Sequence, residues 1–263
     1  MNRITRHFAF LFWAVLLTAC SHIDESERLI YVKPAPAERV VLLEDFTGQR
    51  CPNCPRGTEI IEQLQAEFGD SVVIAVGIHG GPLGFAGRPG AVGLATDVGN
   101  EYYAHWQLEY QPVGLVNRHG AVNYPDWTRT VREELQKTAP LQLRLGAVLH
   151  GDQVDIAVEA MGTDGSTSGR LQVWLLEDSI TAMQLMPDGK RKDDYVHNHV
   201  LRTPVNGAWG DEFAVAEGET SRAVLSQTVD EAWNRRQLSV VAFVYDGQGV
   251  QQAVRARVTG VDE

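Results

Sequence analysis

Two cysteines three positions apart are the residues of this sequence best suited to covalent chemistry. Cys51 and Cys54, in the segment Cys-Pro-Asn-Cys, follow an apolar run at positions 40–43 and precede a helical pattern. A Cys-x-x-Cys motif between a strand and a helix is typical of a redox pair, because its thiols can close a small disulfide ring. The start of a helix lowers the pKa of a thiol, and the thiolate is the nucleophile. We therefore expect Cys51 to attack and Cys54 to resolve.

The helix that must hold these thiols is marked by prolines and by an apolar stripe. Pro52 suits the first helical position, where no N–H is needed. Pro55 removes a bond within the first turn and is expected to bend the helix. Beyond it, four apolar side chains recur at helical spacing and predict one buried face: Ile60, Ile61, Leu64 and Phe68.

Two other interpretations of the cysteine pair stay open at this point. A zinc site needs two further ligands, and the sequence has no second Cys-x-x-Cys, so only histidines could complete it. A purely structural disulfide is the other alternative, because an exported pair can remain oxidised indefinitely.

The segment from Glu44 to Pro55, which reads Glu-Asp-Phe-Thr-Gly-Gln-Arg-Cys-Pro-Asn-Cys-Pro, resembles the active-site segment of the thioredoxin superfamily. More narrowly, the chain resembles the Bacteroidota family of outer-membrane lipoproteins named for a twenty-eight-kilodalton founding member. That resemblance also draws on segments 195–202 and 207–210, so it covers most of the mature chain. This resemblance says more about the location of the protein than about its chemistry. An exchange reaction between thiols and disulfides requires no metal and no organic cofactor.

The thioredoxin resemblance assigns roles to further residues. It implies that Pro112 is the cis-proline that faces the Cys-x-x-Cys, and that Gln111 presents its backbone to a substrate strand. The sequence alone indicates only that a proline is tolerated at the start of a strand. Most X-Pro bonds are trans, so the cis assignment rests on the resemblance.

Asp45 is the carboxylate that such a fold would place beneath the start of the helix. A buried acid there could accept the proton of Cys54, and burial would raise its pKa into a useful range. Glu44 would point to the opposite face of the strand. The alternative is that Asp45 only caps or hydrogen-bonds the backbone. Arg50 and Arg56 flank the thiols and either stabilise a thiolate or lie in solvent.

The N-terminus predicts export and lipidation. Arg3 and Arg6 precede an apolar run at positions 8–17, which predicts a signal peptide over residues 1–19. The run ends in Leu-Thr-Ala-Cys, which resembles a bacterial lipobox whose cysteine, Cys20, is diacylated. The alternative is an ordinary signal peptide followed by an incidental cysteine. Lipid on Cys20 would leave the Cys-x-x-Cys as the only pair of free thiols.

Composition limits the class of protein. The chain has 263 residues, 44% hydrophobic and 22% charged, which is enough for two modest domains. Its formal net charge of −11 argues against a nucleic-acid partner, and nothing beyond the N-terminus is long and apolar enough to span a bilayer. Residues 20–38 are polar and predict a lipidated flexible tether. The residue after Cys20 is Ser21, whereas an Asp at this position signals inner-membrane retention in some bacteria. The absence of that Asp favours the outer membrane, on either its periplasmic or its outer face.

Residues 39–139 alternate strand and helix patterns and predict the α/β thioredoxin-like domain. A glycine-rich loop through Gly90 follows the strand at 72–76. Loops at the carboxyl ends of parallel strands line the crevice, so this loop either shapes a peptide site or is a flexible insertion. The stretch between Arg118 and Pro125 leaves little room for the fourth thioredoxin strand, which predicts a short or missing edge strand. Helices are expected at about 96–106 and 127–135.

From position 140 the pattern alternates with a period of two. About seven short strands predict an all-β immunoglobulin-like sandwich over residues 140–263, without its disulfide because no cysteines remain. The strands are expected at 141–149, 154–160, 171–177, 223–229, 238–245 and 250–258. The expected fold class is thus an α/β thioredoxin-like domain followed by an immunoglobulin-like sandwich.

Three histidines have two interpretations each, and one charged run has a single interpretation. His197 and His199 alternate on what would be one strand face, so they either share a metal or hydrogen-bond locally and contact the first domain. His79 either approaches the crevice or is a hydrogen-bonded structural histidine. Residues 190–194 are expected to form a solvated loop.

The first functional hypothesis is a lipid-anchored thiol–disulfide oxidoreductase of the outer membrane. Its partners would be exported protein thiols and disulfides and a redox partner protein. The second is a non-catalytic binding lipoprotein in which the disulfide is a staple. A third is a histidine-based metal-handling protein.

Overall fold

The computed structural model describes residues 33–260, and from Pro34 onward the chain forms one compact unit. Cys20, the predicted signal peptide and most of the predicted tether lie outside the described residues. Among the described helices, none has the length and apolar character needed to cross a membrane.

The N-terminal region, residues 39–139, is built on a small set of buried strands. Strand β2 (Val41–Thr47) runs parallel to β3 (Val73–His79) and antiparallel to β4 (Val113–Val116). All residues of these strands are buried, as expected for strands covered on both faces. Strand β5 (Ala121–Asn123) completes this edge, so the predicted short edge strand is confirmed.

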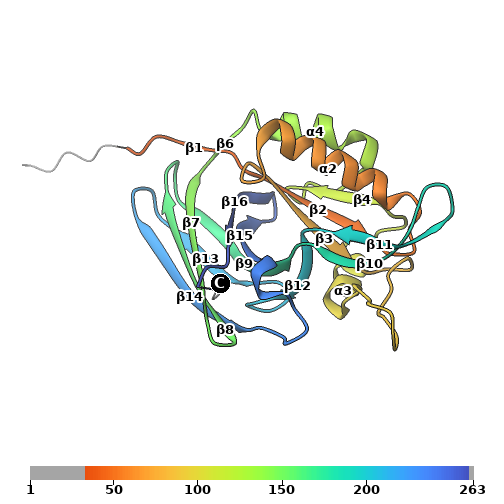
Figure 1. Ribbon diagram of the computed structural model, residues 1–263. Helices are drawn as coiled ribbons and strands as arrows, with labels where there is room; N and C mark the ends of the chain where they lie inside the picture. Colours follow the sequence, from red (N-terminus) through yellow and green to blue (C-terminus); the bar gives the residue numbers. More distant parts are fainter. Residues whose placement is uncertain (1–32, 261–263) are drawn as a thin grey trace, which may run out of the picture. The chain divides into compact units, whose positions relative to one another are not determined.

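Helices cover both faces of these strands (Figure 1). On one face, α2 (Cys54–Phe68) and α4 (Trp127–Glu134), which follows the 3₁₀ turn η3 (Tyr124–Asp126), pack on the odd-numbered side chains of β2. On the other face lies α3 (Asp97–His105), whose N-cap Thr96 accepts a hydrogen bond from Gly99 N. The predicted helices and the stripe of α2 are confirmed.

The prediction for the start of α2 is wrong in detail. The helix begins at Cys54, with Asn53 as its N-cap, so Pro52 lies outside it. Pro55 falls in the first helical turn, where the backbone N–H has no helical acceptor. It therefore suits the helix start and does not interrupt the hydrogen-bond ladder.

One mixed sheet continues from β3 into the C-terminal region, residues 140–260. Strand β12 (Val200–Pro204) pairs in parallel with β3, where Val200 faces Gly77, and antiparallel with β9 (Thr167–Glu177). Beyond β9 follow β15 (Leu238–Asp246) and β16 (Gly249–Arg257), and β13 (Asp211–Val215) also pairs with β9. The β15 strand is preceded by the 3₁₀ turn η4 (Arg235–Gln237).

A second layer of strands packs on β9 and β15. It consists of β7 (Leu141–His150), β8 (Gln153–Gly162) and β14 (Thr220–Thr228), all antiparallel. The alternating side chains of β7 and β8 meet those of β9 and β15 in one apolar core, as the period of two predicted. Two small ladders complete the fold: β1 (Ala37–Glu38) with β6 (Thr138–Ala139), and β10 (Ile180–Leu185) with β11 (Arg191–His197).

The described chain is thus a mixed α/β sheet with separate antiparallel sheets. The character of the chain changes near position 140, but the main sheet takes strands from both regions. The boundary between two domains at residues 139 and 140 stays a prediction. Strands β10 and β13 were not predicted, because they are short or carry polar, exposed residues. The single strand expected through His197 and His199 is instead interrupted between β11 and β12. Residues 191–194, expected in a loop, are exposed as predicted but belong to β11.

Candidate functional site

The predicted cysteine pair forms a disulfide at the start of α2. Cys51 and Cys54 are bonded, with their Cα atoms 5.4 Å apart. Cys51 ends a tight turn, residues 48–51, in which its N–H donates to Gly48 O at 3.0 Å. Both cysteines are nearly inaccessible, with exposed fractions of 1% and 2%. The chemistry of this site therefore depends on what covers the two sulfur atoms.

The glycine-rich loop, residues 80–95, is the first segment bonded to the turn that carries Cys51. Arg50 N donates to Leu83 O at 3.0 Å, and a Cβ on Gly48 would lie 2.3 Å from the same oxygen, so only glycine allows this approach. Gln49, fully buried, donates from Nε2 to Val92 O and accepts from Leu94 N. The loop is therefore hydrogen-bonded to the turn that carries Cys51.

The residue before Pro112 also holds this loop. The Gln111–Pro112 peptide bond is cis, as the resemblance implied. The Gln111 side chain donates to Thr47 O at 2.7 Å and to Gly80 O at 3.0 Å, and it accepts from Leu83 N at 3.2 Å. Gln111 thus fixes the loop by its side chain, a contact that the sequence did not indicate.

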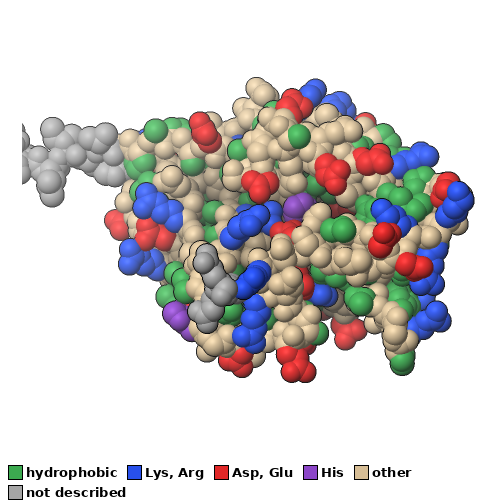
Figure 2. Space-filling view, viewed as in Figure 1, with side chains coloured by type: hydrophobic (Ala, Val, Ile, Leu, Met, Phe, Trp, Pro, Cys, Tyr) green, Lys and Arg blue, Asp and Glu red, His purple; other side chains and the backbone are tan. Residues whose placement is uncertain are grey.

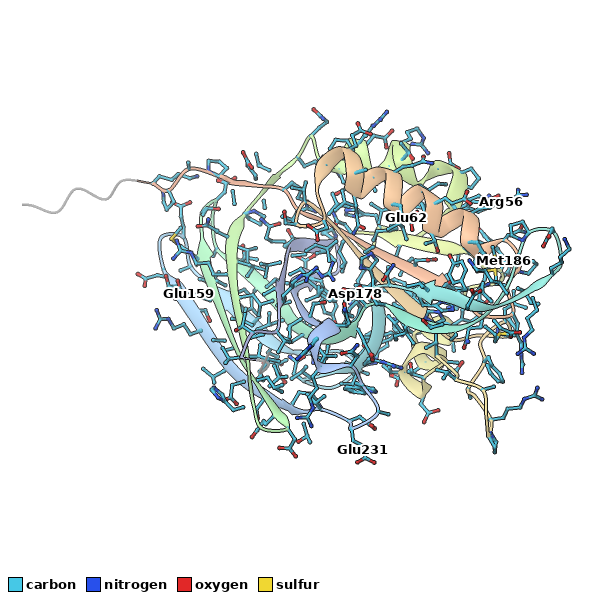
Figure 3. The ribbon with its side chains drawn as sticks, viewed as in Figure 1. Arg56, Glu62, Glu159, Asp178, Met186 and Glu231 are labelled. Atoms are coloured by element: carbon cyan, nitrogen blue, oxygen red, sulfur yellow. A yellow bond between two sulfur atoms is a disulfide. The ribbon has the colours of Figure 1, made fainter. Side chains whose placement is uncertain are left out.

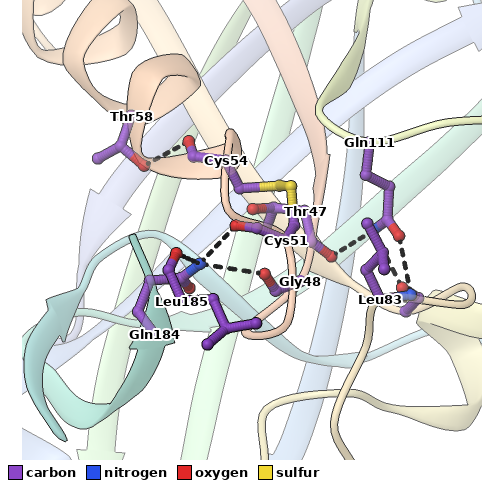
Figure 4. Close-up of a disulfide and its surroundings, with 10 residues drawn as sticks. Thr47, Gly48, Cys51, Cys54, Thr58, Leu83, Gln111, Gln184 and Leu185 are labelled. Carbon is purple, nitrogen blue, oxygen red and sulfur yellow. Dashed lines mark hydrogen bonds between the residues drawn. A yellow bond between two sulfur atoms is a disulfide. The ribbon is translucent and has the colours of Figure 1, made fainter. Parts of the chain in front are cut away.

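The β10–β11 hairpin from the C-terminal region is the second segment bonded to this turn. Gln184 Nε2 donates to Cys51 O at 2.8 Å and to Gly48 O at 3.3 Å (Figure 4). Leu185 N donates to Gln49 O at 2.9 Å. Figure 4 shows Gln184 and Leu185 on one side of the turn and Leu83 and Gln111 on the other. No motif marks Gln184 in the sequence, so sequence reasoning missed it.

Asp45 lies where the thioredoxin resemblance placed it, on the α2 side of β2. It is 3% exposed, and its Oδ1 has no hydrogen-bond partner. Burial raises the pKa of Asp45 to about 8. Asp45 lines the same cavity as Cys54. The orphaned oxygen argues against the alternative in which this side chain only caps the backbone.

The histidines do not lie on one strand face. His197 ends β11 and is buried, whereas His199 follows in a left-handed conformation with φ of 57°. The His199 ring lies 3.2 Å from Asp178 Oδ1. Burial opposes the charge of Asp178, but its contacts with His199 and Arg255 lower the pKa of Asp178 to about 2.

His197 lies next to His79, and both line the cavity that Cys54 also lines. Their ring centroids are 5.4 Å apart, and both rings are buried. Within residues 33–260, no group of three His, Cys, Asp or Glu side chains is arranged to hold a metal.

The two arginines beside the thiols are exposed. The guanidinium of Arg50 stacks over the ring of Phe85 at 4.9 Å from its centroid. Arg56 lies on the outward face of α2 (Figure 3). Arg50 therefore contributes to the loop contact rather than to a pocket around the sulfur atoms.

The fold and this site together define a mixed α/β protein with a covered Cys-x-x-Cys disulfide at a helix start. The family model described as "Outer membrane protein Omp28" matches residues 99–262, and the chain belongs to that family. The predicted location at the outer membrane is therefore confirmed.

Two solved structures from Porphyromonas gingivalis are similar to this chain. HBP35 is 15% identical over 87% of this chain and 80% of its own, with a TM-score of 0.67, which shows a shared fold. A domain of the outer membrane lipoprotein Omp28 is 26% identical over 47% of this chain and 92% of its own, with a TM-score of 0.36. A search of curated proteins finds no match.

Proposed function

We propose that this protein is a thiol–disulfide oxidoreductase of the outer membrane that acts on exported proteins through Cys51 and Cys54. In this proposal the N-terminal region is a thioredoxin-like domain, and the C-terminal region is an immunoglobulin-like sandwich. Lipid on Cys20 tethers both to the membrane. The partners are exported protein thiols and disulfides and a redox partner protein.

The observation that carries the proposal is the unpaired Oδ1 of Asp45, a residue that lines the same cavity as Cys54. A buried polar atom without a partner lowers stability, so a disulfide that serves only as a staple gains nothing from this neighbour. An exchange reaction does gain, because the resolving thiol must lose a proton before it attacks.

The steps use the residues in a fixed order. The Cys51 thiolate attacks a partner disulfide, forms a mixed disulfide and expels one partner thiolate. Cys54 then gives its proton to Asp45, and its thiolate attacks Cys51 Sγ. The Cys51–Cys54 disulfide forms, and the second partner sulfur leaves as a thiolate that takes a proton from water. The reverse sequence reduces the enzyme.

Both cysteines are buried, so exchange with a protein requires that neighbouring segments, such as the loop or the hairpin bonded to the turn, move. This same burial favours a second candidate, a binding lipoprotein in which the disulfide is structural. The two candidates differ in how easily the disulfide is reduced.

The deciding experiment is the equilibrium reduction potential of the Cys51–Cys54 pair, measured by alkylation in graded thiol buffers. An oxidoreductase should fall between about −120 and −270 mV, whereas a value below about −300 mV is typical of a structural disulfide and contradicts the proposal. In addition, Cys54→Ser should trap mixed disulfides with exported proteins, and Cys51→Ser should trap none.

A further inference from the structure

A small cavity lies beneath Cys54, between α2 and β11. Its volume is about 40 Å³, and its inner wall includes Asp45, Cys54, His79 and His197, all of them buried. Toward solvent it is lined by exposed residues such as Glu62, which Figure 3 shows on α2. The cavity therefore connects the resolving cysteine with the surface.

Three buried atoms around this cavity have no hydrogen-bond partner in the protein. They are Asp45 Oδ1, His79 Nδ1 and His197 Nε2. They come from β2, β3 and β11, so both regions of the chain contribute to the cavity. A volume of about 10–15 Å³ is enough for one water molecule, and a water needs two to four polar partners. The cavity is large enough for a water molecule, and the three unpaired atoms belong to residues that line it.

The two histidines remain uncharged at neutral pH. Burial, and then the neighbouring His197, lower the pKa of His79 to about 3. Burial lowers the pKa of His197 to about 4, although the backbone at Met183 and Ala182 acts in the opposite direction. A neutral imidazole offers one donor and one acceptor, which suits it to orient water without binding a proton permanently.

We propose that His79 and His197 are positioning residues that hold the water through which the proton of Cys54 leaves, by way of Asp45. This inference rests on the proposed function. Cys54 transfers its proton to the Asp45 carboxylate, and its sulfur displaces the partner thiolate from Cys51. Asp45 then passes the proton to the cavity water, which releases it to solvent. The bonds and the charge balance, and no further reactant is needed.

The charged and titratable groups near the two imidazoles come from several elements. His79 and His197 are buried, and the face seen in Figure 2 carries interspersed acidic and basic side chains. The groups that line the cavity or act on the pKa of His79 are Asp45 on β2, Glu62 on α2, Tyr195 on β11, His199 before β12 and Arg202 on β12. Only Asp45 among the side chains on the buried inner wall is acidic, so it is the group that receives the proton.

The test separates the two thiol steps with 5,5′-dithiobis(2-nitrobenzoate). The reduced full chain should release thionitrobenzoate in two phases, the first from attack by Cys51 and the second from resolution by Cys54. His197→Phe, which removes the ring nitrogens, should slow the second phase at least tenfold and shift the midpoint of its pH profile. The first phase should not change, and His197→Gln should restore the second phase to within about threefold.

The control is His150→Phe, which alters an exposed histidine on β7 and should change neither phase. If His197→Phe does not fold, His79→Leu and His79→Gln make the same comparison. A second phase whose rate and pH profile are unchanged in the apolar variants overturns the inference and leaves the proposed function standing. A wild-type protein that releases no thionitrobenzoate contradicts the proposed function, and the inference fails with it.

Discussion

Two neighbouring carboxylates on β2, Glu44 and Asp45, lie on opposite faces of the same buried strand and have opposite surroundings. Both are almost fully buried, at 1% and 3% exposure. Glu44 accepts two hydrogen bonds through Oε1 from Arg118, at 3.0 Å from Nε and 2.7 Å from the terminal nitrogen. Asp45 has an oxygen with no partner at all. Burial alone therefore does not decide what a carboxylate does in this sheet.

The Glu44 face is a closed structural site. The Arg118 guanidinium is surrounded by aromatic rings, of which Tyr245 and Phe243 are nearest, at 4.4 and 4.8 Å from the ring centroids. Burial opposes the charge of Arg118, but the contact with Glu44 raises the pKa of Arg118 above its ordinary value. Because these rings belong to β15, the ion pair joins the N-terminal region to the C-terminal region.

On the opposite face, Asp45 has no cationic partner among residues 33–260, and this leaves its carboxyl free to exchange a proton. No cation compensates the carboxylate, so the neutral acid is favoured in the folded protein. A group that gains and loses a proton near neutral pH is useful in thiol exchange, whereas a permanent ion pair is not. The two faces show that the partner, and not the residue type, separates a structural carboxylate from a reactive one.

Removing the cation from the Glu44 face should have the largest effect. Arg118→Met leaves Glu44 buried and unpaired and should lower the free energy of unfolding by about 3–5 kcal/mol. Urea unfolding measures this loss. The control Arg132→Met removes an exposed pair with Glu67 and should cost no more than about 1 kcal/mol. A double variant, Glu44→Leu with Arg118→Met, should recover most of the stability, and equal losses in all three proteins would refute the comparison.

The Asp45 face should respond to pH instead. The pKa of Asp45 rises from 3.8 to about 8 on folding, so its contribution to stability is complete below about pH 4 and is lost as the pH rises through 8. Burial lowers the pKa values of His79 and His197, so their contribution to stability is lost as the pH falls below 6.5, the ordinary pKa of histidine. Between pH 6.5 and 8 the oxidised protein should lose up to about 1.4 kcal/mol of unfolding free energy per pH unit.

Asp45→Asn should flatten this dependence between pH 6.5 and 8 and should stabilise the protein at pH 8. Unfolding by urea at several pH values measures both effects. Glu44→Gln serves as the matched control, because it alters the neighbouring carboxylate and should leave the slope in place. An identical slope in wild type and Asp45→Asn would show that Asp45 does not take up a proton on folding.

The smallest effect should come from the hairpin that covers the Asp45 face. Gln184→Ala removes hydrogen bonds to Cys51 O and Gly48 O and should accelerate reduction of the disulfide by dithiothreitol about tenfold, since such a loss costs about 1–3 kcal/mol. Gln172→Ala is the control, because Gln172 is equally buried but bonds to Asn206 and Gly207, away from the disulfide. Equal rates in both variants would mean that the hairpin does not limit access.

Local patterns in the sequence were enough to predict the cysteine pair and the helix and strands around it. The spacing of Cys51 and Cys54, the stripe of α2 and the apolar runs of β2 and β3 depend on residues a few positions apart, and each is present in the structure. The position of Asp45 on the α2 face follows from the alternation of a strand. These features are determined by periodicity and spacing, which a sequence displays directly.

The tertiary structure alone decided what surrounds the pair. Gln184 bonds to Cys51 across 133 positions. Arg118 meets the rings of Trp174 and Phe243 only because β9 and β15 join the sheet of β2 and β3. The separation of His197 from His199 depends on one left-handed residue after β11. Such contacts arise when distant segments pack to bury apolar surface, and no short-range pattern records which segments will meet.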